Sequence, residues 1–313
     1  MYYTFTIPKK SGGVRTISAP DKNLKAFQRG LLRMLQKQLW LSRRAHGFAK
    51  NRNILTNAKV HVGKRWILNL DIRDFFPSIR QEGVTMTNRS KGEKFFSHTE
   101  NTYRMYHNEV LPQGAPTSPF LSNYFMRDFD TQIVGLLRKL VSDDIEYTRY
   151  ADDMTFSSNS RAIERVVGFV ESRLRSMKMK LNDDKTRLMG RGQRQEITGL
   201  NINSGRPTIP KKYRRKVRAL VHRASNGWII THKQMESLLG MISHVALCHP
   251  EEAKKYREAL SAVNPATATR RLGSIKRIHL QAKKKHSASK GISAANTHNQ
   301  STRKLRRINE CVN

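Results

Sequence analysis

Two adjacent carboxylates, Asp152 and Asp153, are the residues whose types and spacing point most directly to chemistry. They lie between two runs of strand-favouring residues, 145–149 and 154–156, so the sequence predicts a tight hairpin with the acid pair at its tip. Like charges this close repel each other, and burial would raise their pKa values. A divalent cation would supply the opposite charge. The pair alone leaves a solvated acidic turn open as the alternative.

A third carboxylate, Asp71, lies in the apolar run 66–72, which predicts a buried strand that delivers the acid at its end. With Asp152 and Asp153 it would offer the hard oxygen ligands that suit Mg²⁺, and we expect two ions. Two such ions about 3.5–4 Å apart can activate a hydroxyl and stabilise a leaving group. Asp74 could face solvent or contact a phosphate. For Asp71 the alternative is a strand-end carboxylate paired with an arginine.

The flanking sequence predicts the elements that must position these acids. A basic turn with two glycines, 9–13, precedes a strand at 14–17 and then a helix at 24–41. Another helix is expected to open at Ser118–Pro119, where proline suits the first turn. A further amphipathic stretch covers 162–179, between the acid pair and Lys185.

Four segments together resemble the palm motifs of reverse transcriptases. They are, in chain order, residues 70–79, 111–119, 150–153 and 181–186. One match is moderately specific, whereas four in the family order are highly specific. The resemblance implies an α+β right-hand polymerase fold with fingers, a palm built on an antiparallel sheet, and a helical thumb. It also implies that Asp71, Asp152 and Asp153 are catalytic, and that the backbone carbonyl of Ile72 joins them as a metal ligand.

Two shorter segments narrow the resemblance to retron reverse transcriptases. Residues 57–61 fit an N-A-x-x-H element, and 197–200 resemble a V-T-G element with Ile in place of Val. We assign Asn57 and His61 to RNA binding. The resemblance implies a noncoding RNA that is both template and primer, synthesis from a guanosine 2′-hydroxyl, and a branched single-stranded DNA product (msDNA). It further implies an effector protein acting in defence against phage.

The resemblance also assigns side chains to the incoming dNTP. A hairpin carrying Lys9 and Arg15 would close over the triphosphate, and Phe76 would pack under the sugar and exclude a 2′-hydroxyl. Lys185 would act near the pyrophosphate. The alternatives are an ordinary hairpin for Arg15, core packing for Phe76 and a surface position for Lys185. The full nucleotide-binding set is Lys9, Arg15, Arg52, Phe76, Gln113 and Lys185.

The charge balance indicates a polyanionic partner. Lys and Arg number 59 against 24 acids, a net charge of +35, and phosphate contacts would dominate affinity for nucleic acid. Seven cations fall within 211–223 with no acid between them, which favours a nucleic-acid groove over a solvated face. From this helix we assign to RNA binding Lys211, Lys212, Arg214, Arg215 and Arg218.

We expect three regions along the chain. Fingers and palm occupy 1–203, divided near residue 65; a helical thumb occupies 204–263; a basic flexible tail occupies 264–313. No run of 18 apolar residues occurs, so no membrane partner is expected. Residues 1–4 lack a signal-peptide pattern, and Cys248 and Cys311 lack metal or disulfide spacing. These features predict a bacterial cytoplasmic location.

Three functions remain open on the sequence alone. The first is a retron reverse transcriptase. The second is another bacterial reverse transcriptase, such as a group II intron maturase or a diversity-generating enzyme, although nothing after residue 264 has the Cys/His spacing of an added nuclease domain. The third is a non-catalytic RNA-binding protein with a degenerate palm, which the presence of all three carboxylates disfavours.

Overall fold

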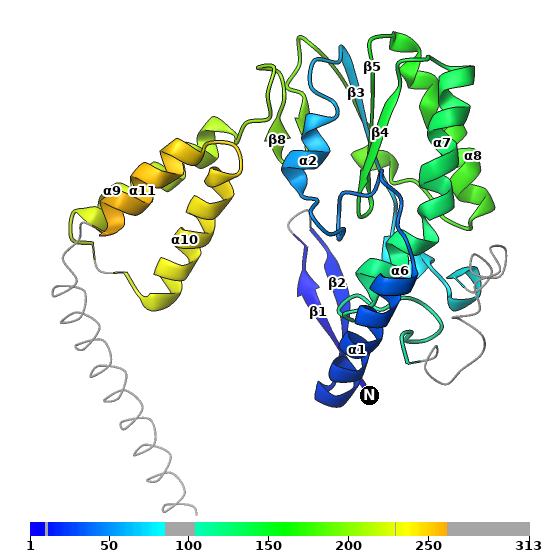
Figure 1. Ribbon diagram of the computed structural model, residues 1–313, viewed down its shortest axis with the longest axis horizontal. Helices are drawn as coiled ribbons and strands as arrows, with labels where there is room; N and C mark the ends of the chain where they lie inside the picture. Colours follow the sequence, from blue (N-terminus) through cyan, green and yellow to red (C-terminus); the bar gives the residue numbers. More distant parts are fainter. Residues whose placement is uncertain (10–11, 85–103, 229, 262–313) are drawn as a thin grey trace, which may run out of the picture. The chain divides into compact units, whose positions relative to one another are not determined.

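The computed structural model describes residues 1–9, 12–84, 104–228 and 230–261 (Figure 1). The chain divides into two compact units, Met1–Lys211 and Lys212–Asn313. The predicted regions 1–203, 204–263 and 264–313 stay predictions; the division between the two units falls at the start of α9 (Lys211–Ser225). Two backbone hydrogen bonds between Asn201 and Thr208 explain this, since they hold the intervening loop to the first unit. The expected basic tail, 264–313, lies outside the described residues.

A four-stranded antiparallel sheet in the order β4-β5-β3-β6 lies at the centre of the first unit. Its strands are β3 (Trp66–Asp71), β4 (Glu146–Tyr150), β5 (Asp153–Ser158) and β6 (Arg187–Gly190). Every residue of β5 after Asp153 is buried, as expected for an inner strand covered on both faces. The mixed helices and antiparallel sheet confirm the α+β class.

Three helices complete the core around this sheet: α6 (Ser118–Phe125), α7 (Arg127–Leu140) and α8 (Val166–Ser176). Figure 1 shows α7 and α8 side by side. Their apolar faces join one core with the strands, through side chains such as Phe129, Val170, Leu68 and Phe156. The amphipathic stretch predicted at 162–179 begins as a 3-10 turn, η1 (Arg161–Arg165), and Ser160 caps this turn by accepting a hydrogen bond from the Ala162 N–H.

The N-terminal part of this unit contains a two-stranded ribbon, β1 (Tyr2–Pro8) and β2 (Val14–Pro20), followed by α1 (Lys22–Gln38). Asp21 caps α1 by accepting a hydrogen bond from the Leu24 N–H at 2.8 Å. Two short helices flank β3: α2 (Ile54–Lys59) before it and α3 (Phe75–Ser78) after it. The remaining elements are η2 (Asp183–Lys185), β7 (Glu196–Ile197) and β8 (Leu200–Asn201).

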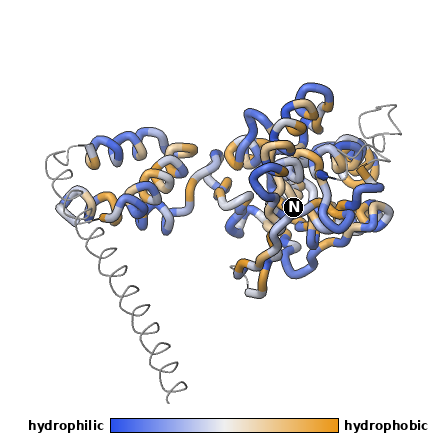
Figure 2. Tube along the Cα trace, turned by 90° about the horizontal axis from the view of Figure 1, so that it is seen from below, coloured by the Kyte–Doolittle hydropathy of each residue, from blue (hydrophilic) through white to orange (hydrophobic). Residues whose placement is uncertain are grey.

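The described part of the second unit consists of α9, α10 (His232–Ala246) and α11 (Pro250–Ser261). Hydrophobic and hydrophilic positions alternate along these helices (Figure 2). The hydrophobic positions form a core of their own, which includes Val217, Val221, Leu238, Ile242 and Tyr256. Within the described residues of the whole chain, no helix combines the length and the apolar character needed to cross a membrane.

Candidate active site

The acid pair lies at the tip of the β4–β5 hairpin, as the sequence predicts. Tyr150 and Asp153 are the last paired residues, so Ala151 and Asp152 form a two-residue turn. Ala151 has a φ of +59°, which is the left-handed conformation that such hairpin turns require. Two residues at the tip of a short hairpin have little freedom, so the positions of both carboxylates are set by β4 and β5.

Strand β3 brings Asp71 directly beside this turn. Asp71 is the Cα partner of Asp153 in the antiparallel pairing of β3 with β5. The N–H of Ile72 donates to the carbonyl of Asp152 at 3.1 Å and extends the pairing past the strand end. The side chain of Asp71 is almost fully buried. Three carboxylates from two chain segments therefore lie together at one end of the inner strands β3 and β5.

The lysine-bearing segment contacts the buried carboxylate. Lys185, at the end of η2, places its Nζ 2.8 Å from Oδ2 of Asp71. Asn182 donates from Nδ2 to Oδ1 of the same side chain at 3.1 Å, and its N–H donates to the Asp71 carbonyl at 2.8 Å. Asn182 is a site residue that the sequence prediction missed, although it precedes Lys185 by only three positions. Both oxygens of Asp71 thus have a donor.

Burial and the neighbouring negative charges raise the pKa values of both acids in the turn. Desolvation raises the pKa of Asp152, and the neighbouring Asp71 raises it further, against the opposing charges of Lys185 and Arg15. Asp153 keeps some surface in solvent, but desolvation and the charges of Asp152 and Asp71 raise its pKa to about 7. Desolvation lowers the pKa of Lys185, yet its hydrogen bond to Asp71 and the charges of the three carboxylates together outweigh this, and the pKa is raised overall.

A buried polar network lies beneath the turn and was not expected from the sequence. The guanidinium of Arg149 forms a bidentate ion pair with Asp130, at 2.9 and 2.7 Å. It also donates to Oδ1 of Asn123 and to the carbonyl of Ala151, each at 3.0 Å. Tyr147 donates its hydroxyl to Asp130 at 2.8 Å. Arg149 and Asp130 are fully buried, so this network fixes the backbone of the turn that carries the acid pair.

The donor types around the turn fit magnesium, since all three are carboxylates. Across the described residues, however, no three His, Cys, Asp or Glu side chains stand together as a group ready to hold a metal ion. The cation that contacts Asp71 is the ammonium of Lys185. An ion bound by Asp71 would therefore replace this ammonium on one carboxylate oxygen.

Of the predicted nucleotide-binding residues, Arg15 lies near the acid pair, whereas Gln113 and Phe76 are positioned by contacts with other segments. Arg15 is exposed on β2, and its charge is among those that lower the pKa of Asp152. Gln113 accepts a hydrogen bond at its carbonyl from the Ser18 N–H, at 2.8 Å, which joins its loop to the ribbon. Phe76 is half-buried beside Phe75 and Phe48, with ring centroids 5.5 and 6.2 Å away.

The other predicted nucleotide contacts lie in less constrained positions. Lys9 is exposed in the ribbon turn, where its N–H donates to the Gly13 carbonyl at 3.0 Å. Arg52 is exposed and lies 2.9 Å from Nε2 of His46. Asp74, for which two roles were open, has a φ of +45° and precedes α3 without a side-chain cap bond; its side chain is exposed.

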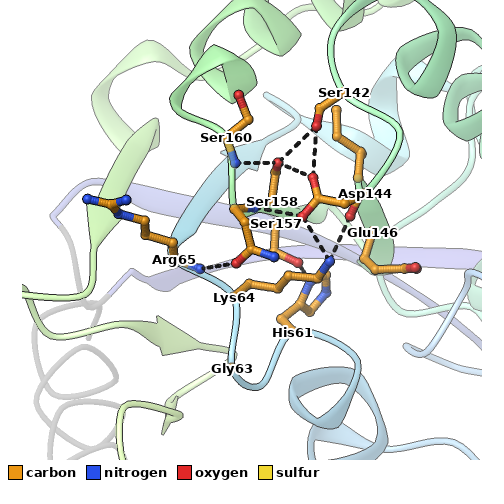
Figure 3. Close-up of polar contacts among 12 residues, drawn as sticks. His61, Gly63, Lys64, Arg65, Ser142, Asp144, Glu146, Ser157, Ser158 and Ser160 are labelled. Carbon is orange, nitrogen blue, oxygen red and sulfur yellow. Dashed lines mark hydrogen bonds and ion pairs between the residues drawn. The ribbon is translucent and has the colours of Figure 1, made fainter.

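His61 has no surface with which to contact RNA, contrary to its sequence assignment. It is fully buried, and its ring nitrogens lie 2.7 Å from the hydroxyls of Ser157 and Thr148 (Figure 3). Burial and nearby cations lower its pKa to about 3, so the ring is neutral at pH 7. The same edge of the sheet carries Asp144, whose carboxylate bonds Lys64 and Ser158. His61 therefore fastens α2 to β4 and β5.

Asn57 is likewise buried, and it connects the two short segments that resemble retron enzymes. Its Nδ2 donates to Oγ1 of Thr198 at 3.5 Å, and α2 lies against β7 and β8. The N-A-x-x-H and I-T-G-L segments are thus parts of one structural joint. Little of the Asn57 side chain reaches solvent. Its role is therefore packing, and the assignment of direct RNA contact does not fit its burial.

The cations assigned to RNA on α9 divide into two groups. Arg214 bonds Glu252 of α11 through Nε at 2.7 Å, and Arg218 contacts the same carboxylate at 3.4 Å. Tyr256 donates to it as well. Lys211, Lys212 and Arg215 are exposed. Arg214 therefore helps to hold α9 against α11, whereas Arg218 is also exposed and remains a candidate for RNA contact together with Lys211, Lys212 and Arg215.

An antiparallel sheet that aligns Asp71 with a two-acid hairpin turn, and a lysine segment against it, define the palm of a right-hand polymerase. Residues 7–236 match the family Reverse transcriptase (RNA-dependent DNA polymerase). The retron Ec86 reverse transcriptase of Escherichia coli is 31% identical over 266 residues, 84% of this chain and 80% of that protein. The chain therefore belongs to the reverse transcriptase family, among the retron enzymes.

Other relatives agree with this placement. The retron Mx65 and Mx162 reverse transcriptases of Myxococcus xanthus are 35% and 30% identical, over 81% and 83% of this chain. The chain spans 63% and 60% of the length of these two proteins. Among solved structures, telomerase from Candida tropicalis matches 88% of this chain and 59% of its own, at 13% identity and a TM-score of 0.49.

Proposed function

We propose that this chain is the RNA-directed DNA polymerase of a retron and makes single-stranded DNA from a noncoding RNA. The observation that carries the proposal is the register of β3 and β5, which sets Asp71 opposite Asp153 at the hairpin tip. Family membership supplies the template and product classes. A degenerate RNA-binding palm is disfavoured because the three acids, Lys185 and the buried support beneath the turn are all present together.

In this proposal Asp71, Asp152 and Asp153, with the carbonyl of Ile72, hold two Mg²⁺ ions. When bound, these ions would activate the primer hydroxyl and stabilise the pyrophosphate leaving group. Burial, and then the charges of the neighbouring carboxylates, raise the pKa values of Asp152 and Asp153; bound cations would offset both effects. Arg149 keeps the turn in place through the carbonyl of Ala151, so the carboxylates need not reorganise during nucleotide transfer.

The remaining side chains would orient the dNTP. Arg15, which lies close enough to influence Asp152, would pair with the triphosphate together with Lys9. Phe76 would pack beneath the sugar, where a 2′-hydroxyl would clash with the ring. Gln113 would contact the nucleotide, with its backbone fixed by Ser18. Lys185 would leave Asp71 as the site fills and donate a proton to, or neutralise, the departing pyrophosphate.

The wider system follows the family. We propose that the cognate noncoding RNA serves as template and primer in the bacterial cytoplasm, that a guanosine 2′-hydroxyl starts synthesis, and that msDNA results. An effector protein would act with the enzyme in defence against phage. The exposed cations of α9, Lys211, Lys212, Arg215 and Arg218, would contact the RNA.

The nucleic acid that copurifies with the protein tests the retron assignment. We expect a small defined RNA joined to single-stranded DNA, and a long intron RNA would instead indicate a maturase-like enzyme. Incorporation of dNTPs on a primed RNA tests catalysis, with Asp152→Asn expected to abolish it. Asp143→Asn, which removes an exposed acid outside the site, is the matched control. Equal incorporation by wild type and Asp152→Asn would refute the enzyme assignment.

A further inference from the structure

Asn182 lies directly opposite Asp71 at the point where β3 ends. The antiparallel pair of Ile72 with Leu181 continues the pairing past the strand. A backbone hydrogen bond beside this pair runs from the Asn182 N–H to the Asp71 carbonyl, at 2.8 Å. The backbone therefore places the short side chain of Asn182 next to that of Asp71, because cross-strand neighbours lie on the same face.

The side chain of Asn182 bonds this carboxylate and not its own helix. Asn182 is the N-cap residue of η2, a position where asparagine usually accepts a hydrogen bond from the helix backbone. Within η2, all of which the structure describes, its side chain makes no cap bond. Its Nδ2 donates instead to Oδ1 of the buried Asp71, at 3.1 Å. This exchange of a cap for a carboxylate indicates a role in the site.

The two oxygens of Asp71 have donors of different kinds. Oδ2 accepts from Lys185 at 2.8 Å, and this lysine is half-exposed on a long flexible stem. Oδ1 accepts from Asn182, which is half-buried and held by its own backbone bond. A metal ion at Asp71 would repel the ammonium of Lys185, because their charges have the same sign. It would leave the neutral amide of Asn182 on Oδ1.

An amide that stays on Oδ1 restricts how an ion can bind the carboxylate. The hydrogen bond fixes the plane of the Asp71 carboxylate and engages one of its two oxygens. Ca²⁺ has flexible coordination and often takes both oxygens of one carboxylate, whereas Mg²⁺ is smaller and requires near-ideal octahedral geometry. Two oxygens of one carboxylate lie too close together to span the right angle between octahedral positions. A carboxylate with one engaged oxygen therefore suits Mg²⁺ better than Ca²⁺.

We propose that Asn182 is a positioning residue that makes Asp71 a ligand through Oδ2 alone, and that it thereby favours Mg²⁺ over larger divalent cations such as Ca²⁺. Asn182 does not touch the ion and acts through Asp71. The proposal rests on the proposed function, because the ion is the one expected at the three carboxylates.

The first experiment measures metal affinity without catalysis. Mn²⁺ is titrated into the full-length protein without RNA or dNTP, and the free ion is counted by electron paramagnetic resonance. Mg²⁺ and Ca²⁺ then compete with the bound Mn²⁺, and Asp71→Asn, which lacks the ligand, defines the background. We expect Asn182→Ala to lose about tenfold in Mg²⁺ affinity and little in Ca²⁺ affinity, so that the preference for Mg²⁺ falls by the same factor.

Two further variants are matched to Asn182→Ala. Asn69 on β3 is also half-buried, and its Nδ2 donates to the Glu196 carbonyl at 2.8 Å. Asn69→Ala therefore removes a similar amide bond away from the carboxylates and should bind both ions as wild type does. Lys185→Gln removes the donor from the other oxygen of Asp71. It should bind both ions more tightly with an unchanged ratio of affinities, because the ammonium competes with either ion.

Four results of the titration would overturn the proposal. The first two are an unchanged Mg²⁺ affinity in Asn182→Ala and an equal loss for Mg²⁺ and Ca²⁺. The third is a Lys185→Gln protein whose ratio of affinities changes as much as that of Asn182→Ala, since the two donors would then be equivalent. The fourth is a wild type that binds no Mn²⁺ above the Asp71→Asn background.

The second experiment separates positioning from a purely structural role. Urea unfolding in the presence of a chelator compares Asn182→Ala with Asn69→Ala. We expect Asn182→Ala to unfold at no lower urea concentration than Asn69→Ala; a much lower midpoint, or a changed metal preference in Asn69→Ala, would show a general loosening of the sheet and overturn the proposal. Neither experiment needs catalysis. Metal affinities that follow the expectation in a wild type that fails to incorporate dNTPs would contradict the proposed function alone.

Discussion

Arg149 is the residue on which the geometry of the catalytic turn most depends. It forms four hydrogen bonds, two to Asp130, one to Asn123 and one to the carbonyl of Ala151. Every partner is buried, so none can be replaced by water without opening the core. A buried pair of this kind is costly to break, because loss of one partner leaves the other charge uncompensated.

We expect Arg149→Met to destabilise the protein by about 3–5 kcal/mol, since it leaves Asp130 charged and buried. The double variant Arg149→Met/Asp130→Leu removes both charges and should recover much of this loss. Its polymerase activity should stay low, because the Ala151 carbonyl still lacks its donor. Urea unfolding and dNTP incorporation measure the two effects. A double variant no more stable than Arg149→Met would contradict the ion-pair account.

Asp153 predicts a pH dependence that metal binding should reverse. Its pKa is about 7 in the folded chain against 3.8 for an ordinary aspartate, so the folded state holds a proton that the unfolded state has released between these values. Stability therefore falls as pH rises from about 4 to 7. Asp153→Asn mimics the protonated acid and should lack this fall. Urea unfolding of wild type and Asp153→Asn at several pH values, in the presence of a chelator, measures this fall in stability. Added Mg²⁺ should stabilise wild type and so remove the fall.

At the scale of elements, α2 and the hairpin that carries the acids are held together by His61. The imidazole lies 2.7 Å from a hydroxyl of β4 (Thr148) and from one of β5 (Ser157). A histidine in a short family motif resembles a binding residue when only the sequence is known. Its actual partners, Thr148 and Ser157, come from distant parts of the chain, so no local pattern indicates that they meet.

His61→Gln tests whether this joint is structural. Because the folded pKa is about 3 and the unfolded value 6.5, the unfolded chain binds an extra proton between them, and wild type loses stability as pH falls below 6.5. His61→Gln should lack this acid-dependent loss and should be destabilised at pH 7, by about 1–3 kcal/mol. Unfolding curves at several pH values measure both effects. Unchanged stability together with weakened RNA binding would restore the RNA-contact assignment.

Helix α9 offers a matched pair of neighbouring arginines with different environments. Arg214 is bonded to Glu252, whereas Arg215 is exposed. We expect Arg214→Gln to lower the stability of the α9–α11 unit by about 1–2 kcal/mol, with little change in the salt dependence of RNA binding. Arg215→Gln should do the reverse and reduce the log–log salt slope by nearly 1. Thermal unfolding and RNA titration separate the two; identical profiles for both variants would show that the division of cations is wrong.

On the scale of the whole molecule, the sequence predicts residues whose positions follow from the pattern of their own segment. It does not predict residues whose roles depend on a partner from another element. Asp71 ends an apolar strand, and the acid pair sits between two strand-like runs, so both local positions and their meeting in a palm follow from pattern and resemblance. Lys185 contacts Asp71, and its role near the pyrophosphate stays a prediction. Arg149 gave a weaker signal that was not used: a charged residue inside a buried strand requires a buried partner. Asp130, which provides it, lies on α7, the helix directly before β4, and the sequence alone does not show that these two side chains meet.

The charge excess of the whole chain predicts how its C-terminal segment contributes. Residues 264–313 carry twelve Lys or Arg and one acid, so a chain ending at Ser261 should bind RNA less tightly at low salt, with a smaller log–log salt slope. At high salt the difference should vanish, because screening removes the phosphate contacts first. Turnover with saturating primer–template and dNTP should not change, since every residue of the candidate active site is retained. A full-length variant with these twelve cations replaced by glutamine is the control and should behave like the shortened chain; equal salt slopes for wild type and both variants would show that the segment takes no part in binding.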